Sequence, residues 1–254
     1  MNALDVDLLT VSYDKTPVLW DVSFSVPKGE LVGIIGPNGA GKSTLIKCLL
    51  GLVRPIAGTV TFFDRPLWNI QQEIAYIPQK EAVDWEFPIT VRELILMGRY
   101  AKLGLFKRPR PADYQAVDHY LEIVGLTPFK DRQINQLSGG QQQRAFLARS
   151  LIQEAKIYFL DEPFTGIDAS TELVIIHLLK KLASEGKTVF VVHHDLSNVS
   201  SLFTWVILLN LRLIGSGPTA KVFTPNNLKQ TYGKSYALLD EAAKLAQERK
   251  IGSL

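Results

Sequence analysis

The chain has 254 residues, of which 28 are Lys or Arg and 25 are Asp or Glu, and its net charge is +3. This length favours one α/β unit with an inserted subdomain and a sizeable core. The near-balanced charge argues against a nucleic-acid partner. The single cysteine, Cys48, excludes an internal disulfide and is typical of a reducing compartment. We expect Cys48 to pack within a helix rather than to react.

The N-terminal part of the chain predicts strands around one helix. Polar and apolar residues alternate, as they do in half-buried strands, over three stretches: 7–11, 19–26 and 59–63. The first two should be joined by a turn near Asp14 and Lys15. The continuous apolar run 31–35 predicts a buried strand, and residues 44–50 predict a helix that ends at Gly51.

The remainder of the chain predicts helices and then a strand–helix–strand unit. Helix-spaced apolar residues occur in three segments separated by breaks rich in Pro and Gly: 91–97, 114–124 and 141–152. Residues 104–111 are basic and should form a loop. Two buried strands, 156–160 and 188–192, flank a helix at 170–183, which is the pattern of a βαβ unit. The tail from Ser235 onward is helix-prone.

No segment predicts secretion or membrane insertion. Residues 1–11 lack a basic start followed by an apolar stretch, so we expect no signal peptide. The most apolar segment, 205–214, is interrupted by Asn210 and Arg212 and is too short to span a bilayer. We therefore expect a soluble protein that, if it works at a membrane, docks on another protein.

Residues 36–43 read Gly-Pro-Asn-Gly-Ala-Gly-Lys-Ser and fit the phosphate-binding pattern G-x-x-x-x-G-K-[ST]. The predicted strand before them and the predicted helix after them are the context that this loop requires. Its glycines let the backbone turn tightly and bring N–H groups close to phosphates, and the helix start adds a partial positive charge. Lys42 would reach the β- and γ-phosphates, and the Ser43 hydroxyl would ligate Mg²⁺. The alternative is a glycine-rich turn with an incidental lysine.

Residues 137–141 read Leu-Ser-Gly-Gly-Gln. Ser138 can cap a helix whose third residue is Gln141, which would form a capping box. That local interpretation does not explain Gly139 and Gly140, because adjacent glycines destabilise a helix. We interpret them as residues that let an anion approach the backbone closely at the helix start.

A third motif ends the predicted strand at 156–160 with two carboxylates, Asp161 and Glu162, followed by Pro163. Ligands of α/β folds bind at the carboxyl ends of the strands. We expect Asp161 to hold Mg²⁺ through a water molecule and Glu162 to orient the attacking water. The alternative is that the pair only ends the strand or caps the helix that follows.

Together the three motifs resemble those of the nucleotide-binding subunits of ATP-binding-cassette (ABC) transporters, over roughly residues 5–225. The resemblance implies an α/β fold: a P-loop NTPase (ABC ATPase) core with an antiparallel β subdomain and an inserted α-helical subdomain. The implied parts are the nucleotide-binding core with its β subdomain at 5–88 and 151–232, the helical signature subdomain at 89–150, and a helix-prone C-terminal tail at 233–254.

The resemblance also assigns roles to single residues. Tyr13 matches the aromatic residue that stacks on adenine, although it could simply be an exposed aromatic of a strand. Gln79 matches the glutamine that senses Mg²⁺ and the γ-phosphate, unless it is only a loop amide. Asp168 matches the loop that crosses to a partner subunit. His194, rather than His193, is assigned to the γ-phosphate, because the family pattern is a strand followed by His-Asp.

The expected site therefore has three groups of residues. The catalytic residues are Lys42, Gln79, Glu162 and His194. The ATP-binding residues are Tyr13, Gly36, Pro37, Asn38, Gly39, Ala40, Gly41, Lys42, Ser43, Thr44, Ser138, Gly139, Gly140, Gln141 and Asp168. The Mg²⁺ ligands are Ser43, Gln79 and Asp161.

The resemblance further implies partners. A homodimer would bury two ATP molecules between the P-loop of one copy and residues 137–141 of the other. A separate membrane permease would be gripped at residues 83–91, where Trp85 and Phe87 either line the contact or pack within the subdomain.

Three stretches are similar to those in subunits of manganese, zinc and iron importers: 83–91, 97–100 and 161–166. We therefore expect the ATP-hydrolysing subunit of a prokaryotic ABC importer, with manganese as the first expectation for its cargo and zinc or iron next. It would be peripheral at the cytoplasmic face of the plasma (inner) membrane, and a metal-binding extracytoplasmic protein would be an indirect partner. One alternative is an ABC ATPase for a non-metal cargo. The other, a soluble ABC ATPase acting on DNA or ribosomes, is disfavoured by the single cassette and the balanced charge.

Overall fold

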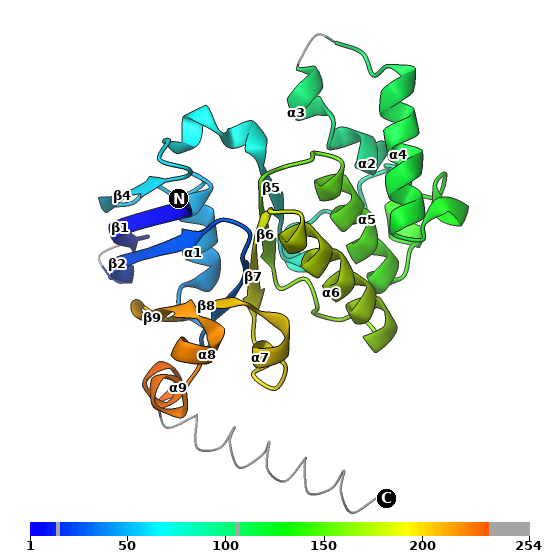
Figure 1. Ribbon diagram of the computed structural model, residues 1–254. Coiled ribbons are helices and arrows are strands. Elements are labelled where there is room, and N and C mark those ends of the chain that lie inside the picture. The colour runs from blue at the N-terminus through cyan, green and yellow to red at the C-terminus, as the bar shows by residue number, and fades with distance from the viewer. Residues whose placement is uncertain (14–15, 105–106, 234–254) are drawn as a thin grey trace, which may run out of the picture. The chain divides into compact units, whose positions relative to one another are not determined.

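The computed structural model describes residues 1–13, 16–104 and 107–233 (Figure 1). The chain divides into two units: the first joins Met1–Leu67 with the segment from Val192 onward, and the second is Trp68–Val191. Two expected features, the turn near Asp14 and the helix after Ser235, lie outside the described residues.

A three-stranded antiparallel sheet belongs to the first unit. Its strands lie in the order β2 (Pro17–Pro27), β1 (Asn2–Ser12) and β4 (Ala57–Thr61), which confirms the three strands expected from alternation. Val6 of β1 lies opposite Phe24 of β2 and Val60 of β4. Leu8 interrupts the alternation at a bulge: its φ is 48° and its side chain is 57% exposed, so Leu9 returns to the buried face.

The first unit also contains the strand that leads into the phosphate-binding motif. β3 (Leu31–Ile35) is buried along its whole length and pairs in parallel with β8 (Trp205–Asn210). β8 turns back through Leu211 into the antiparallel strand β9 (Arg212–Pro218), so the most apolar segment of the sequence forms a hairpin. Among the described residues, no helix combines the length and apolar character needed to span a bilayer.

The described part of the first unit has the helices α1 (Lys42–Leu49), α7 (Val199–Leu202), α8 (Thr219–Val222) and α9 (Pro225–Tyr232). The helix expected after the phosphate-binding motif is confirmed as α1. It begins at Lys42, buries Leu45 and Ile46, and ends where Gly51 adopts a left-handed φ of 71°.

The second unit pairs β5 (Ile74–Ile77) in parallel with β6 (Ile157–Asp161). β7 (Thr188–His193) follows and carries the chain from the second unit back to the first. The rings of Phe159 and Phe190 stack with their centroids 4.7 Å apart, which packs β6 against β7. The buried strands expected near 156–160 and 188–192 are thereby confirmed.

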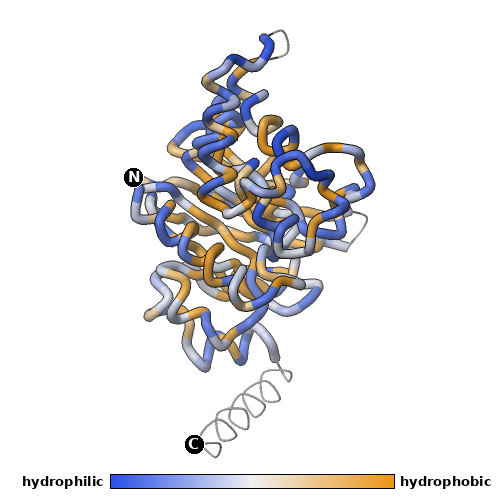
Figure 2. The backbone as a smooth tube through the Cα atoms, turned by 90° about the vertical axis from the view of Figure 1, so that its right-hand side faces the viewer, coloured by the Kyte–Doolittle hydropathy of each residue, from blue (hydrophilic) through white to orange (hydrophobic). Residues whose placement is uncertain are grey.

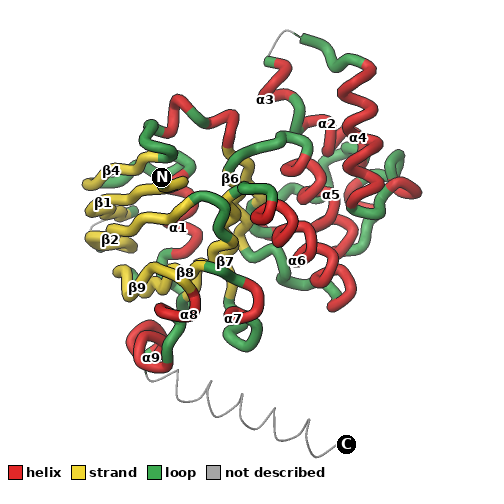
Figure 3. Tube along the Cα trace, in the orientation of Figure 1, coloured by secondary structure: helices red, strands yellow, loops and turns green. Residues whose placement is uncertain are grey.

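The helices of the second unit gather together in Figure 3: α2 (Val91–Met97), α3 (Tyr100–Leu103), α4 (Pro111–Ile123), α5 (Gly139–Leu151) and α6 (Ala169–Ser184). α2 has the predicted bounds, and a capping box between Thr90 and Glu93 fixes its start. The expected loop at 104–111 is too long by one residue, because Pro111 already opens α4 at the position that proline favours. The predicted domain boundaries after residues 88 and 150 fall inside this unit and remain predictions.

Short 3-10 turns join many of these elements: Leu67–Asn69, Gln71–Glu73, Lys80–Ala82, Thr127–Phe129 and Ile134–Gln136. Hydrophobic and hydrophilic stretches alternate along the traced chain in Figure 2, as expected for elements that have one buried and one exposed face.

Candidate functional site

The phosphate-binding loop between β3 and α1 is built on glycines that no other residue could replace without strain. Gly39 and Gly41 have φ values of 79° and 93°, in the left-handed region. A Cβ on Gly36 would lie 2.1 Å from the carbonyl oxygen of Leu209 on β8, so this residue packs directly against the neighbouring strand. The loop geometry is therefore the one that the motif predicted.

Lys42 is held inside this loop. Its side chain is only 6% exposed, and its ammonium donates hydrogen bonds of 2.9 Å to the carbonyl oxygens of Gly36 and Pro37. α1 begins at Lys42 and has no acidic residue in its first turn. A buried ammonium beside the positive end of a helix suits a polyphosphate, so this loop fits the triphosphate of ATP.

Tyr13 and Thr44, two predicted ATP-binding residues of the first unit, lie side by side. The Tyr13 hydroxyl is 3.3 Å from the Thr44 hydroxyl, and the tyrosine side chain is 56% exposed. The ring is therefore accessible to a planar base, and stacking on adenine remains a prediction.

The start of α5 has the predicted capping box. The Gln141 N–H donates to Ser138 Oγ at 3.3 Å, and the Ser138 N–H donates to Gln141 Oε1 at 2.9 Å. A Cβ on Gly140 would lie 2.9 Å from Thr171 Oγ1 on α6, so close packing of two helices already requires one of the two glycines. Ser138 is exposed, as a residue that meets a partner's ligand must be.

Two of the predicted Mg²⁺ ligands meet at the end of β6. Asp161 is 1% exposed, and the Gln79 amide Nε2 lies 3.4 Å from Asp161 Oδ1. Burial, together with the negative charge of Asp161, raises the pKa of Tyr76 to about 12. The Asp161 carboxylate therefore acts electrostatically on a neighbouring side chain. Amide, hydroxyl and carboxylate oxygens are the donors that Mg²⁺ prefers, so the chemistry of this donor set fits the ion.

Within the described residues, no group of three or more His, Cys, Asp or Glu side chains could hold a metal by itself. Glu162, the residue after Asp161, has a left-handed φ of 54°, which is unusual for a residue with a side chain. Its side chain is half-buried, and Thr165 Oγ1 lies 3.4 Å from its carboxylate.

The structure separates the two adjacent histidines. His193 is 3% exposed, its Nε2–H donates to Asn198 Oδ1 at 2.6 Å, and its ring meets that of Phe203 edge-on at 5.4 Å. His194 is exposed. Only His194 is accessible to a ligand in this conformation, which agrees with its predicted role without testing it.

Asp168 caps α6. Its Oδ1 accepts hydrogen bonds from the Thr171 N–H at 2.9 Å and from the Ser170 hydroxyl, and its Oδ2 accepts from Thr171 Oγ1 at 2.9 Å. The hydrogen bonds from Ser170 and Thr171 hold the pKa of Asp168 well below its usual range. The carboxylate thus serves its own chain as an N-cap, and its predicted contact with a partner subunit remains a prediction.

The sequence left the roles of Trp85 and Phe87 open between packing and docking. The Trp85 ring meets the Phe146 ring of α5 edge-on at 5.2 Å, and its indole N–H donates to the Lys80 carbonyl at 2.8 Å. Trp85 is therefore a packing residue of the second unit. Phe87 is 54% exposed and remains available for docking.

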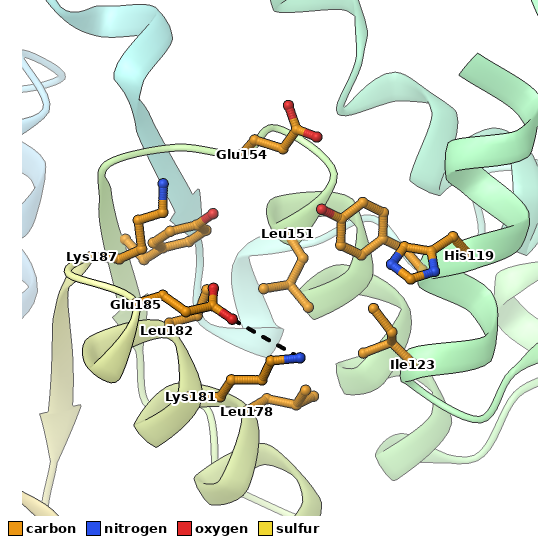
Figure 4. Close-up of a pocket in the computed structure, with 11 residues that line it drawn as sticks. His119, Ile123, Leu151, Glu154, Leu178, Lys181, Leu182, Glu185 and Lys187 are labelled. Atoms are coloured by element: carbon orange, nitrogen blue, oxygen red, sulfur yellow. Dashed lines mark ion pairs between the residues drawn. The ribbon is translucent and has the colours of Figure 1, made fainter. Parts of the chain in front are cut away.

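The second unit also contains a cavity of about 400 Å³ between the C-terminal parts of α4, α5 and α6 (Figure 4). His119, Tyr120 and Tyr158 contribute to its wall, and Lys181 and Glu185 form an ion pair of 4.0 Å at its rim. None of the predicted site residues lines this cavity. Pocket volume alone therefore does not identify the functional site of this protein.

In each unit, one residue in contact with or next to a predicted motif was not singled out by the sequence. In the first unit, Asn198 accepts the hydrogen bond that orients the His193 ring. The only sequence signal for this contact was an Asn five positions after the His that ends a strand. Lys80 follows Gln79 directly, yet its place beside Gly139 depends on tertiary contacts that no local pattern encodes.

Comparison with known proteins decides the family. The family model of ABC transporters matches residues 19–165. The chain belongs to the ABC transporter family. As an ABC ATPase, it binds ATP and hydrolyses it to power transport.

Relatives of this ABC ATPase cover almost its whole length. The manganese transport system ATP-binding protein MntB of Bacillus subtilis (strain 168) is 51% identical over 95% of this chain and 96% of its own. The zinc transport system ATP-binding protein TroB of Treponema pallidum (strain Nichols) is 50% identical over 91% of this chain and 87% of its own. A solved structure described as a metal-chelate type ABC transporter in an inward-facing conformation superposes with a TM-score of 0.79 at 32% identity, covering 91% of this chain and 88% of its own. The predicted fold class is thereby confirmed.

Proposed function

We propose that this ABC ATPase is the ATP-hydrolysing subunit of a prokaryotic importer of divalent metal ions, with manganese as its cargo and zinc or iron as the next candidates. The observation that carries the proposal is the 51% identity, over 95% of the chain, to the manganese transport protein of Bacillus subtilis. The 50% identity to a zinc transport protein keeps zinc as the nearest competitor. A non-metal cargo is the alternative.

The proposed reaction assigns each step to residues of this chain. Lys42 exchanges the carbonyls of Gly36 and Pro37 for the β- and γ-phosphate oxygens of ATP. Glu162 orients the attacking water and accepts its proton, and His194 and Gln79 contact the γ-phosphate. Ser43, Gln79 and Asp161 would hold Mg²⁺, which would neutralise charge on the phosphates. Tyr13 stacks on the adenine.

The proposed assembly is a homodimer docked on a separate membrane permease at the cytoplasmic face of the membrane, supplied by an extracytoplasmic metal-binding protein. Ser138, Gly139 and Gly140 of one copy contact the γ-phosphate held by the other, and Asp168 lies near that contact. Exposure of Ser138 at the positive end of α5 supports this arrangement. Nucleic acid has no part in the proposal, in keeping with the net charge of +3.

Dimerisation can be tested on the isolated chain. Glu162→Gln should bind ATP and form a dimer that persists, because hydrolysis no longer removes the γ-phosphate. Adding Ser138→Arg should prevent that dimer while leaving ATP binding by the monomer within about twofold, since its own P-loop is unchanged. Analytical ultracentrifugation with ATP and with ADP measures both. A Ser138→Arg variant that dimerises as well as its parent would overturn the composite site.

Cargo can be tested in the source cell. Deleting the gene should lower the cellular content of one metal, and wild-type protein but not Glu162→Gln should restore it. Mass spectrometry of manganese, zinc and iron in cells grown in metal-limited medium measures the effect. Unchanged contents of all three metals would reject the metal cargo and favour the non-metal alternative, while the ATPase assignment would stand.

A further inference from the structure

We propose that Lys80 is an additional ligand of the γ-phosphate that a second copy of the chain presents to the start of α5. The inference rests on the proposed composite site and extends it by one residue. Lys80 follows Gln79 and opens the short turn Lys80–Ala82, so nothing in its immediate sequence associates it with residues 137–141.

The ammonium of Lys80 lies directly over the first residue of α5. A Cβ on Gly139 would be 3.1 Å from Lys80 Nζ and 3.4 Å from the Gly166 carbonyl oxygen. A side chain at position 139 would therefore require the lysine to shift by a few tenths of an ångström. The glycine leaves room both for an anion and for the cation that would meet it.

The electrostatics of this arrangement favour an anion. α5 runs for 13 residues, and its N-terminus carries the partial positive charge of the helix dipole. An ammonium at that end is repelled by the dipole, whereas a carboxylate there would be attracted. Within the described ranges of the chain, Lys80 forms no ion pair with an Asp or Glu. A phosphate at Ser138 and Gly139 would be stabilised by both positive groups.

The lysine is fixed to α5 by its own backbone. Its carbonyl accepts the 2.8 Å hydrogen bond from the Trp85 indole, and the Trp85 ring packs edge-on against Phe146, about two turns along α5 from Gly139. The segment from Lys80 to Trp85 is therefore attached to the helix whose start it faces. If α5 moves when a dimer closes, Lys80 moves with it.

The test uses the full chain with Glu162→Gln as the parent, so that ATP is bound but not consumed. In that background Lys80→Met removes the charge and keeps the length of the side chain. The ATP concentration for half-maximal dimerisation should rise about tenfold, the usual effect of losing one charge-assisted hydrogen bond to a phosphate. ATP affinity of the monomer should stay within about twofold, because its own P-loop is untouched. Lys80→Arg should restore dimerisation, and the salt dependence of the Lys80→Met dimer should be weaker than that of the parent.

Lys130→Met is the matched control, since Lys130 directly follows the 3-10 turn Thr127–Phe129 and is not among the predicted site residues. It should leave dimerisation unchanged. Lys80→Gln provides a second neutral variant should Lys80→Met fold poorly. If both neutral variants fold and dimerise like the parent, the role of Lys80 is rejected and the composite site stands. If the parent itself fails to dimerise with ATP, the proposed composite site is rejected, and the proposed role of Lys80 is rejected with it.

Discussion

The Nε2–H of His193 donates a 2.6 Å hydrogen bond to Oδ1 of Asn198. This bond gives the buried member of the adjacent histidine pair a structural role. The neighbouring His194 is exposed and has no comparable internal partner in the described part of the chain. Two chemically identical side chains thus differ at the end of β7: His193 is buried and hydrogen-bonded, and His194 is exposed.

The different surroundings of His193 and His194 predict that one substitution lowers activity and the other lowers stability. His194→Ala should lower kcat for ATP hydrolysis by about a hundredfold and leave stability almost unchanged. Asn198→Ala should lower the free energy of unfolding by about 1–3 kcal/mol, because it removes the hydrogen bond that the buried His193 ring makes to Asn198 Oδ1. Steady-state ATPase assays and urea unfolding measure the two effects. Loss of activity without loss of stability in Asn198→Ala would contradict the structural role of His193.

Glu162→Gln should reduce kcat by about two to four orders of magnitude and leave the Kd for ATP within about threefold, since the amide keeps the size of the side chain but cannot accept the proton of the attacking water. The strained φ of 54° at this position is the same for both residues, so stability should not change. Glu122→Gln on the exposed face of α4 is the control and should hydrolyse ATP like wild type. A Glu162→Gln protein with near-wild-type turnover would remove Glu162 from the reaction.

Gly36→Ala should destabilise the protein itself, because the added Cβ would lie 2.1 Å from the Leu209 carbonyl oxygen. Gly39→Ala meets no atom within 4 Å and suffers only from its φ of 79°, a strain of about 1–2 kcal/mol. We therefore expect Gly36→Ala to lower the melting temperature more than Gly39→Ala does. Thermal unfolding without nucleotide makes the comparison, and equal melting temperatures would contradict the close approach.

Asp113 links stability to pH. Hydrogen bonds from the Arg110 N–H at 2.8 Å and from Arg99 Nε at 3.0 Å hold the pKa of this carboxyl below its ordinary value of 3.8. A carboxyl with a lowered pKa stabilises the fold above its unfolded-state pKa, and that contribution is lost as the pH falls through the lower, folded-state value. Asp113→Asn should cost about 1–3 kcal/mol at pH 7. The gap to wild type should narrow as the pH falls below about 4. A gap that stays constant down to pH 3 would contradict this linkage.

Cys48 should be inert in the folded protein. It is 5% exposed within α1, and burial raises the pKa of its thiol to about 11. At pH 8 only about one molecule in a thousand then carries the reactive thiolate. An aromatic disulfide reagent should label Cys48 in denaturant and leave it unlabelled in buffer. Rapid labelling of the native protein would mean that α1 opens.

The sequence predicted elements well where local signals and tertiary packing agree. α2 has its predicted bounds because Thr90 and Glu93 form the capping box that starts it. The start of α4 was missed because its first turn shows Pro111 and polar residues before the apolar spacing begins, so the pattern pointed to Tyr114. The exposed Leu8 was also unpredictable, since a bulge, not the residue type, turns it outward.

The candidate site divides in the same way. Lys42, Ser138 and Asp161 belong to contiguous motifs, so their local geometry followed from the sequence. The capping role of Asp168 is also local, because its hydrogen-bond partners Ser170 and Thr171 follow it within three residues. The position of Lys80 over Gly139, in contrast, depends on how two segments far apart in the sequence pack together. Such relationships between distant segments leave no periodic or contiguous trace in the chain.

The two carbonyl bonds that tether Lys42 have a consequence for how nucleotide is captured. In the proposed reaction, the loop that binds the phosphates is already formed before ATP arrives, and Lys42 exchanges the carbonyl oxygens of Gly36 and Pro37 for phosphate oxygens. The loop then loses little conformational freedom when ATP binds. The affinity should therefore depend on the number of charges on the nucleotide and not on the cost of ordering the loop.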